Sequence, residues 1–120
     1  MDIKEISTRE LAEKLARKDK FKLIMTFNES GYKAKHIPGS LNIYSQENAA
    51  GLIETSDEII VYCINQSSQA SINAYHVLKH FGFNNIRRYS GGLEAWEEAG
   101  LELEGESTNK KLDVDDGFMK

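Results

Sequence analysis

The sequence contains few of the residues that small proteins use to fasten a fold or to bind metals. Its 120 residues include one cysteine, one proline and one tryptophan. A single cysteine cannot form a disulfide within the chain, and no cysteine and histidine residues have the spacing of metal ligands. We therefore expect a fold held together by its hydrophobic core, with neither a metal nor another cofactor.

Long apolar runs and an excess of positive charge are also missing. No stretch is long enough for a membrane-spanning helix, and the opening MDIKEIS lacks the apolar core of a secretion signal. The formal net charge is -4, whereas proteins that bind nucleic acids normally carry a basic surface. We expect a cytoplasmic protein with no nucleic-acid partner and no membrane partner.

Local patterns along the chain predict alternating helices and strands. Ser7 and Glu10 form a capping box, flanked by the hydrophobic staple of Ile6 and Leu11, which predicts a helix from Thr8 to Arg17. Apolar and β-branched runs predict strands at residues 21–27, 41–43, 58–62 and 84–89. Apolar positions at helical spacing predict helices over 69–81 and 91–100, and residues 46–53 favour a further short helix.

This alternation is typical of an α/β domain with a mainly parallel central sheet between layers of helices. Residues 1–106 carry the pattern and are expected to form one domain. Residues 107–120 are polar and without sustained periodicity, so we expect a flexible tail there.

The single thiol, Cys63, lies where a predicted strand ends and the loop CINQSS begins. In parallel sheets, ligands bind beyond the carboxyl ends of the strands. The amino terminus of the following helix offers partial positive charge, which lowers the pKa of a nearby thiol. A free cysteine at such a place can equally be a small buried hydrophobic residue, and position alone does not separate a structural thiol from a reactive one.

If the loop curls around the sulfur, its backbone amides would form an anion-binding nest without any charged side chain. Ser68 is the expected cap of the helix that begins near Gln69. The residues expected to surround Cys63 are Ile64, Asn65, Gln66, Ser67 and Ser68.

Three segments together resemble the rhodanese family of sulfurtransferase domains. They are HIPGSLNI (36–43), residues 59–96 from IIVYC to GGLEAW, and EAGLELEG (98–105). The resemblance implies a rhodanese-like three-layer domain in which Cys63 takes a sulfane sulfur from a donor and carries it as a persulfide. Residues 64–68 would then supply amides, with side-chain hydrogen bonds from Asn65, Gln66 and Ser68.

Two departures from the family pattern bear on activity. Active members often have Arg or Lys in or beside the loop to hold an anionic donor, and CINQSS has neither. An Asp-Val-Arg triplet closes the first core strand of many members, whereas this chain has Met25, Thr26 and Phe27. The arginine of phosphatases with this fold is also missing, because Gln69 occupies its position, which argues against hydrolysis of phosphate esters.

Other polar residues are expected to be structural or exposed. His36 before the Pro-Gly turn is expected to pack, and His76 and His80 to lie on a solvated helix face without a third ligand. Trp96 is expected to anchor the core. Arg87 and Arg88 are neighbours in a strand and point to opposite faces, so at most one could reach a donor, and surface charge is the favoured interpretation. Lys33 and Lys35 are expected in a solvated loop.

Three hypotheses follow for the function. The first is a single-domain sulfurtransferase that takes sulfur from a small sulfane-sulfur donor or a protein persulfide, with a possible protein acceptor. The second is a catalytically weak rhodanese-like module that binds a partner protein. The third is a redox sensor that uses Cys63 alone.

Overall fold

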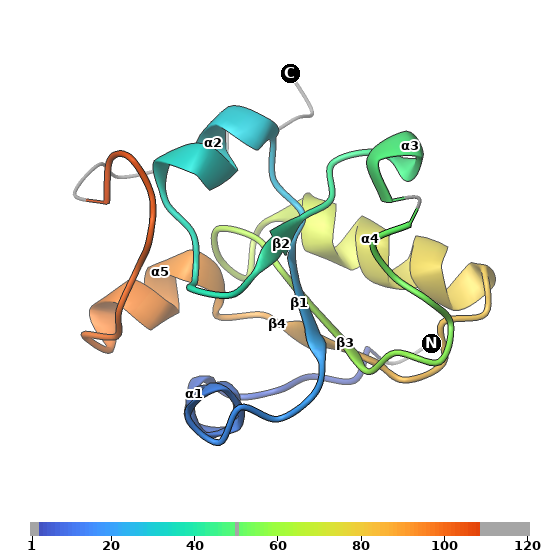
Figure 1. Cartoon of the computed structure of the whole chain (residues 1–120), viewed down its shortest axis with the longest axis horizontal. Coiled ribbons are helices and arrows are strands. Elements are labelled where there is room, and N and C mark those ends of the chain that lie inside the picture. Colours follow the sequence, from blue (N-terminus) through green and yellow to red (C-terminus); the bar gives the residue numbers. More distant parts are fainter. Residues whose placement is uncertain (1–2, 50, 109–120) are drawn as a thin grey trace.

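The computed structural model of the chain describes residues 3–49 and 51–108 (Figure 1). Helices and strands alternate along it, as the sequence predicts. The elements are α1 (Thr8–Ala16), β1 (Lys22–Met25), α2 (Glu29–Ala34), β2 (Leu41–Asn42), α3 (Gln46–Ala49), β3 (Ile59–Tyr62), α4 (Gln69–His80), β4 (Ile86–Tyr89) and α5 (Gly92–Glu98).

The described residues form a four-stranded parallel sheet in the order β2-β1-β3-β4. The central strand β3 pairs on one side with β1 and on the other with β4, so that Val61 lies between Ile24 and Arg88. All four residues of β3 are buried, which explains why its sequence is continuously apolar. Because the strands are parallel, their carboxyl ends meet at one edge, where Cys63 follows β3.

Helices cover both faces of the sheet, and each face has its own core (Figure 1). Leu11 of α1 and Trp96 of α5 pack on one face, and Tyr75 of α4 packs on the other. Trp96 is 4% exposed and its indole donates to the carbonyl of Glu102 at 2.8 Å. The expected three-layer α/β arrangement is therefore confirmed, as is the role of Trp96 in the core.

The capping box at the start of α1 forms only in half. The amide of Glu10 donates to the hydroxyl of Ser7 at 3.1 Å, as expected, and both staple residues, Ile6 and Leu11, are buried. The carboxylate of Glu10, however, accepts from Arg87 of β4 at 2.9 Å. The Glu10 carboxylate therefore binds the charged guanidinium of Arg87 instead of the backbone amide of Ser7. A charge-assisted hydrogen bond is stronger than one to a neutral amide.

One short helix and one buried lysine were not expected from the sequence. Residues 29–34 form α2, which Asn28 caps by accepting from the amide of Gly31 at 2.7 Å. The prediction of a solvated loop is wrong for Lys35, which is 2% exposed and pairs with Glu97 of α5 at 2.9 Å. The Lys35 stem packs in the interior while the pair satisfies its charge.

The expected flexible tail falls largely outside the described residues, which include only its first two, Ser107 and Thr108. The amide of Ser107 donates to the carbonyl of Ala34 at 2.9 Å. Within residues 3–49 and 51–108, none of the helices combines the length and the apolarity that crossing a membrane requires.

Candidate functional site

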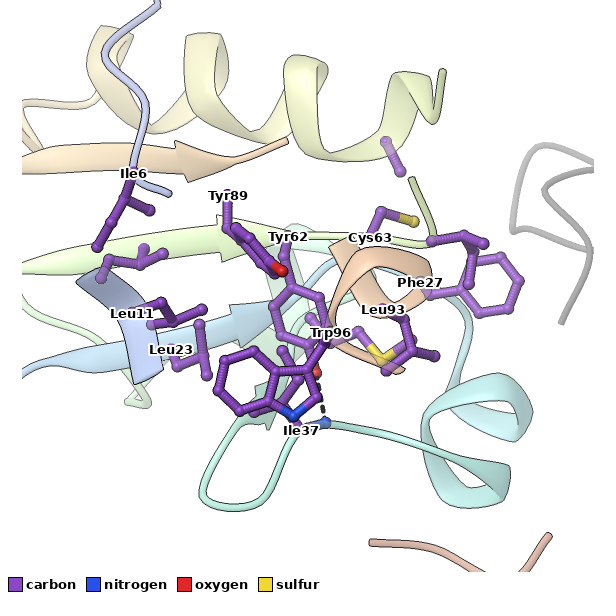
Figure 2. Packing of buried hydrophobic residues seen from close by; sticks show 14 residues of the cluster. Ile6, Leu11, Leu23, Phe27, Ile37, Tyr62, Cys63, Tyr89, Leu93 and Trp96 are labelled. Carbon is purple, nitrogen blue, oxygen red and sulfur yellow. Dashed lines mark hydrogen bonds between the residues drawn. The ribbon is translucent and has the colours of Figure 1, made fainter. Parts of the chain in front are cut away.

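Cys63 opens the loop of residues 63–68 that connects β3 to α4 at the carboxyl edge of the sheet. Figure 2 shows it directly after β3, in the core cluster that also contains Phe27, Tyr62 and Leu93. The residue is 2% exposed. The loop thus places the chain's only thiol at the edge where parallel sheets bind ligands, but beneath the surface.

Burial raises the pKa of the Cys63 thiol, and three polar groups near the sulfur oppose this effect. They are the hydroxyl of Ser68, the amide of Ile64 and the hydroxyl of Thr26, and the charge of Arg88 acts in the same direction. The expectation of a lowered pKa is therefore wrong, because removal of the sulfur from water outweighs these groups. The donors nevertheless lie where a negative charge on the sulfur would need them.

The loop uses most of its amides to hold itself rather than the sulfur. The amide of Asn65 donates to the Ser68 hydroxyl at 3.2 Å, and the amide of Ser67 to the Asn65 side-chain oxygen at 2.9 Å. The amide of Ser68 donates to the Asn65 carbonyl at 3.1 Å. A nest of five amides is therefore a wrong prediction, since a local Asx turn competes for them. Ser68 holds the N-cap position of α4, but its hydroxyl does not cap the helix.

The start of α5 tethers the loop from the other side. The amides of Leu93 and Glu94 donate to the carbonyls of Cys63 and Ile64, each at 2.9 Å. Gly92 has a φ of +65°, and a Cβ there would lie 2.6 Å from the Ile64 carbonyl oxygen. The second glycine of GGLEAW, Gly92, is thus explained by its close approach to the backbone of the loop that carries the thiol.

The residues that replace the family's charged triplet are buried beside Cys63. Met25 and Phe27 are at most 2% exposed, and both belong to the Cys63 core cluster. Thr26 is 4% exposed, and its hydroxyl donates to the Tyr62 carbonyl at 3.2 Å. Where many family members have an ion-pairing triplet, this chain thus has two apolar side chains and one hydroxyl, which lies near the sulfur.

The prediction of surface charge is wrong for Arg88. It is 5% exposed, and its Nε donates to the hydroxyl of Ser71 at 2.9 Å and its Nη2 to the carbonyl of Gln66 at 3.0 Å. The interpretation as surface charge holds for Arg87, whose partners are Glu10 and Glu58. The burial of Arg88 could have been predicted from the alternation of side chains along a strand, because residues 86 and 88 point to the same face and Ile86 is apolar.

The three histidines lie outside the loop of residues 63–68. His36 stacks on Tyr32, and its Nδ1 donates to the Tyr32 carbonyl at 2.6 Å, as expected of a packing residue. His76 and His80 are exposed on α4. In the described part of the chain, no three histidine, cysteine, aspartate or glutamate side chains are grouped so that they could hold a metal ion.

Comparisons with known proteins agree with this architecture. The family model of the rhodanese-like domain matches residues 7–99. A protein from Bacillus halodurans superposes with a TM-score of 0.81 at 22% identity, covering 92% of this chain and 82% of that one. The rhodanese-like domain of a protein from Anabaena sp. superposes with a TM-score of 0.77 at 24% identity, covering 94% and 89%.

A thiosulfate sulfurtransferase from Pseudomonas aeruginosa has a TM-score of 0.75 at 21% identity, but the match covers 88% of this chain and only 21% of that protein. A search of curated proteins found no match. The structural likenesses are below 25% identity and concern the fold. The family match extends over most of the chain, from the start of α1 to the end of α5. The chain belongs to the rhodanese-like domain family.

Proposed function

We propose that this domain is a sulfurtransferase that carries sulfane sulfur as a persulfide on Cys63. The observation that carries the proposal is the position of Cys63 in a rhodanese-like fold, with the Ser68 hydroxyl, the Ile64 amide and the Thr26 hydroxyl near its sulfur. These donors stabilise negative charge on the thiolate, which is the attacking form, and on the persulfide that follows it.

The reaction consists of two thiol exchange steps. The Cys63 thiolate attacks the outer sulfur of a donor persulfide, the new S–S bond forms as the donor's S–S bond breaks, and the donor leaves as a thiolate. An acceptor thiolate then attacks the outer sulfur of the Cys63 persulfide and releases the Cys63 thiolate. Both steps are balanced without an oxidant or a reductant, because one sulfur atom moves and each attacking thiolate replaces a leaving one.

The charges around the loop favour a donor with little negative charge. The loop contains no cationic side chain, and a carboxylate oxygen of Glu94 lies 3.4 Å from the side-chain nitrogen of Asn65. A dianion such as thiosulfate would be repelled there and would lose more hydration on entering. A small organic persulfide or a protein persulfide therefore fits better as donor, with a small thiol or a protein thiol as acceptor.

Mass spectrometry of the intact protein tests this proposal. After incubation with a small organic persulfide, we expect one added sulfur atom on the wild type and none on Cys63→Ala. Since Cys63 is the only cysteine, the adduct has one possible thiol. Thiosulfate should load the protein more slowly. Absence of the adduct with an organic persulfide, a protein persulfide and thiosulfate would contradict the proposal.

The second candidate is a rhodanese-like module that binds a partner with little turnover. The burial of Cys63 and its raised pKa favour it, as do three exposed apolar side chains, Tyr44, Val77 and Phe81. This candidate predicts a partner that binds Cys63→Ala as well as the wild type and no longer binds Phe81→Glu.

A redox sensor is less well supported, because sensor thiols are accessible and have a low pKa. A reversible glutathione adduct without sulfur uptake would favour it.

A further inference from the structure

The guanidinium of Arg88, which comes from strand β4, contacts the loop that begins with Cys63. Arg88 lies in β4, next to the central strand β3, and pairs there with Val61. Its side chain is buried, and its two hydrogen bonds go to the hydroxyl of Ser71 in α4 and to the carbonyl of Gln66 in the loop. It therefore connects three elements that meet around the thiol.

This guanidinium has no close counter-ion in the chain as described. Among residues 3–49 and 51–108, no carboxylate lies within 4.0 Å of Arg88, whereas the neighbouring Arg87 has two such partners. Arginine stays charged in proteins, and a buried charge without a partner is unfavourable. Such a charge is stabilised when an anion forms nearby, and the thiol of Cys63 is a buried group in this region that can become one.

We propose that Arg88 is a positioning residue for sulfur transfer, which holds the loop through the Gln66 carbonyl and provides the counter-charge for the Cys63 thiolate and persulfide. This inference rests on the proposed function of Cys63. Arg88 in strand β4 would thus supply the positive charge that the loop CINQSS itself lacks. The donor then approaches a neutral loop surface while the positive charge acts on the sulfur from inside the protein.

Electrostatic coupling between the two groups agrees with this geometry. The charge of Arg88 lowers the pKa of the Cys63 thiol, and the Cys63 thiolate in turn raises the pKa of Arg88, which burial lowers. Other titratable groups also face this region. Glu5, paired with Arg88 in a β-bridge, partly neutralises the guanidinium, Glu94 of α5 lies beside Asn65, and Tyr62 precedes Cys63 in β3. A test must therefore change the charge at residue 88 alone.

The test measures the rate at which iodoacetamide alkylates Cys63 as a function of pH. Only the thiolate reacts, so the midpoint of the profile reports the pKa of Cys63 without any sulfur transfer. We expect Arg88→Gln, which keeps an amide donor but no charge, to move the midpoint upward and to slow alkylation below the midpoint by about tenfold. Arg88→Lys should restore most of the rate, and Arg87→Met should leave it unchanged.

An unchanged midpoint in a folded Arg88→Gln variant would overturn the inference and leave Arg88 a structural residue. If that variant does not fold, the NMR signal of the Arg88 Nε–H group provides the same test in the intact protein. It should shift when Cys63 ionises in the wild type and stay fixed over the same pH range in Cys63→Ala; an equal response in both would overturn the inference.

These readouts separate this inference from the proposed function. A wild type that takes up no sulfur but shows the Arg88-dependent midpoint would refute the sulfurtransferase and retain the charge coupling. If the wild type takes up sulfur but the midpoint of alkylation is the same in Arg88→Gln, the sulfurtransferase is supported and the charge coupling is refuted. Where both hold, we expect Arg88→Gln to load sulfur about tenfold more slowly at neutral pH, with Arg88→Lys close to the wild type.

Discussion

The two edges of the β-sheet use charged side chains in opposite ways. At the amino edge, Lys22 pairs with Asp57 at 3.1 Å and Lys14 with Glu58 at 2.8 Å. Toward the carboxyl edge, the buried Arg88 donates to a hydroxyl and a carbonyl, and no carboxylate of the described residues lies within 4.0 Å of it. One edge is closed by ion pairs, and the other retains a charge that Glu5 neutralises only in part.

Hydroxyl groups at the carboxyl edge have two different roles. The buried Tyr62 hydroxyl accepts from the amide of Ile37 at 3.0 Å and bonds to the Ser40 hydroxyl at 2.9 Å, which fixes the end of β3 (Figure 2 shows the Ile37 contact). The hydroxyls of Thr26 and Ser68 lie near the sulfur of Cys63 and oppose the rise of its pKa. The carboxyl edge therefore contains one hydroxyl that fixes a strand end and two others that lie around a single sulfur atom.

The largest expected effect comes from the contact between α5 and the loop. Gly92→Ala would place a Cβ 2.6 Å from the Ile64 carbonyl oxygen at a φ of +65°, and we expect a loss of about 3 kcal/mol in the free energy of unfolding. The matched control is Gly100→Ala, whose φ is +76° with nothing within 4 Å, so only about 1 kcal/mol is expected. Urea unfolding measures both, and equal losses would show that the close contact does not matter.

Removal of the Tyr62 hydroxyl should have a moderate effect. Tyr62→Phe leaves the buried Ile37 amide and Ser40 hydroxyl without their common partner, with an expected loss of about 1–2 kcal/mol. In Tyr89→Phe the lost partner is the Thr8 hydroxyl, which is partly exposed and can turn to water, so about 0.5 kcal/mol is expected. Thermal unfolding compares the two variants, and a larger loss in Tyr89→Phe would contradict the assignment.

A smaller effect is expected from pH. Burial raises the pKa of the Cys63 thiol above its value in the unfolded chain. The folded state therefore favours the neutral thiol, and this stabilisation is complete below the unfolded pKa, about 8.5, and is lost as pH rises through the folded pKa. As pH rises into the alkaline range, the free energy of unfolding should fall faster in the wild type than in Cys63→Ala. The two proteins have the same tyrosines, so the difference between them reports Cys63 alone. Parallel curves in urea titrations at several pH values would refute the raised pKa.

The smallest effect is expected from removing the charge of Arg87, which pairs with Glu58 at the amino edge. Arg87 pairs with Glu10 at 2.9 Å and Glu58 at 3.7 Å, and its side chain is 26% exposed. Arg87→Met should lower the free energy of unfolding by about 0.5 kcal/mol, with a smaller difference at high salt. Cys63 alkylation should not change. A slower alkylation would mean that the two edges are not independent, which would weaken the contrast between them.

Most of the fold could be predicted because it depends on local patterns. The apolar run of β3, the helical spacing in α4 and the Ser7 cap of α1 each act within a few residues. The short helix α2 escaped prediction because it has a glycine in its middle. Gly31 is needed there because a Cβ would lie 2.2 Å from the Phe27 ring, a reason that only the packed structure reveals.

The chemistry of the site was harder to predict because it depends on distant contacts. Lys35 is buried since Glu97, 62 residues away, pairs with it. Arg88 is buried since Gln66 and Ser71 of the neighbouring connection accept its hydrogen bonds. The position of Cys63 could be read from the sequence, but its exposure could not, because burial depends on how Thr26, α4 and α5 close around the loop.

The two backbone hydrogen bonds between α5 and the loop also have a mechanical meaning. The carbonyls of Cys63 and Ile64 are held by the first turn of α5, and Glu97 at the far end of that helix is held by Lys35. Helix α5 therefore joins the backbone of the loop that carries Cys63 to the Lys35–Glu97 ion pair. A shift of this helix would move the carbonyls of Cys63 and Ile64 with it.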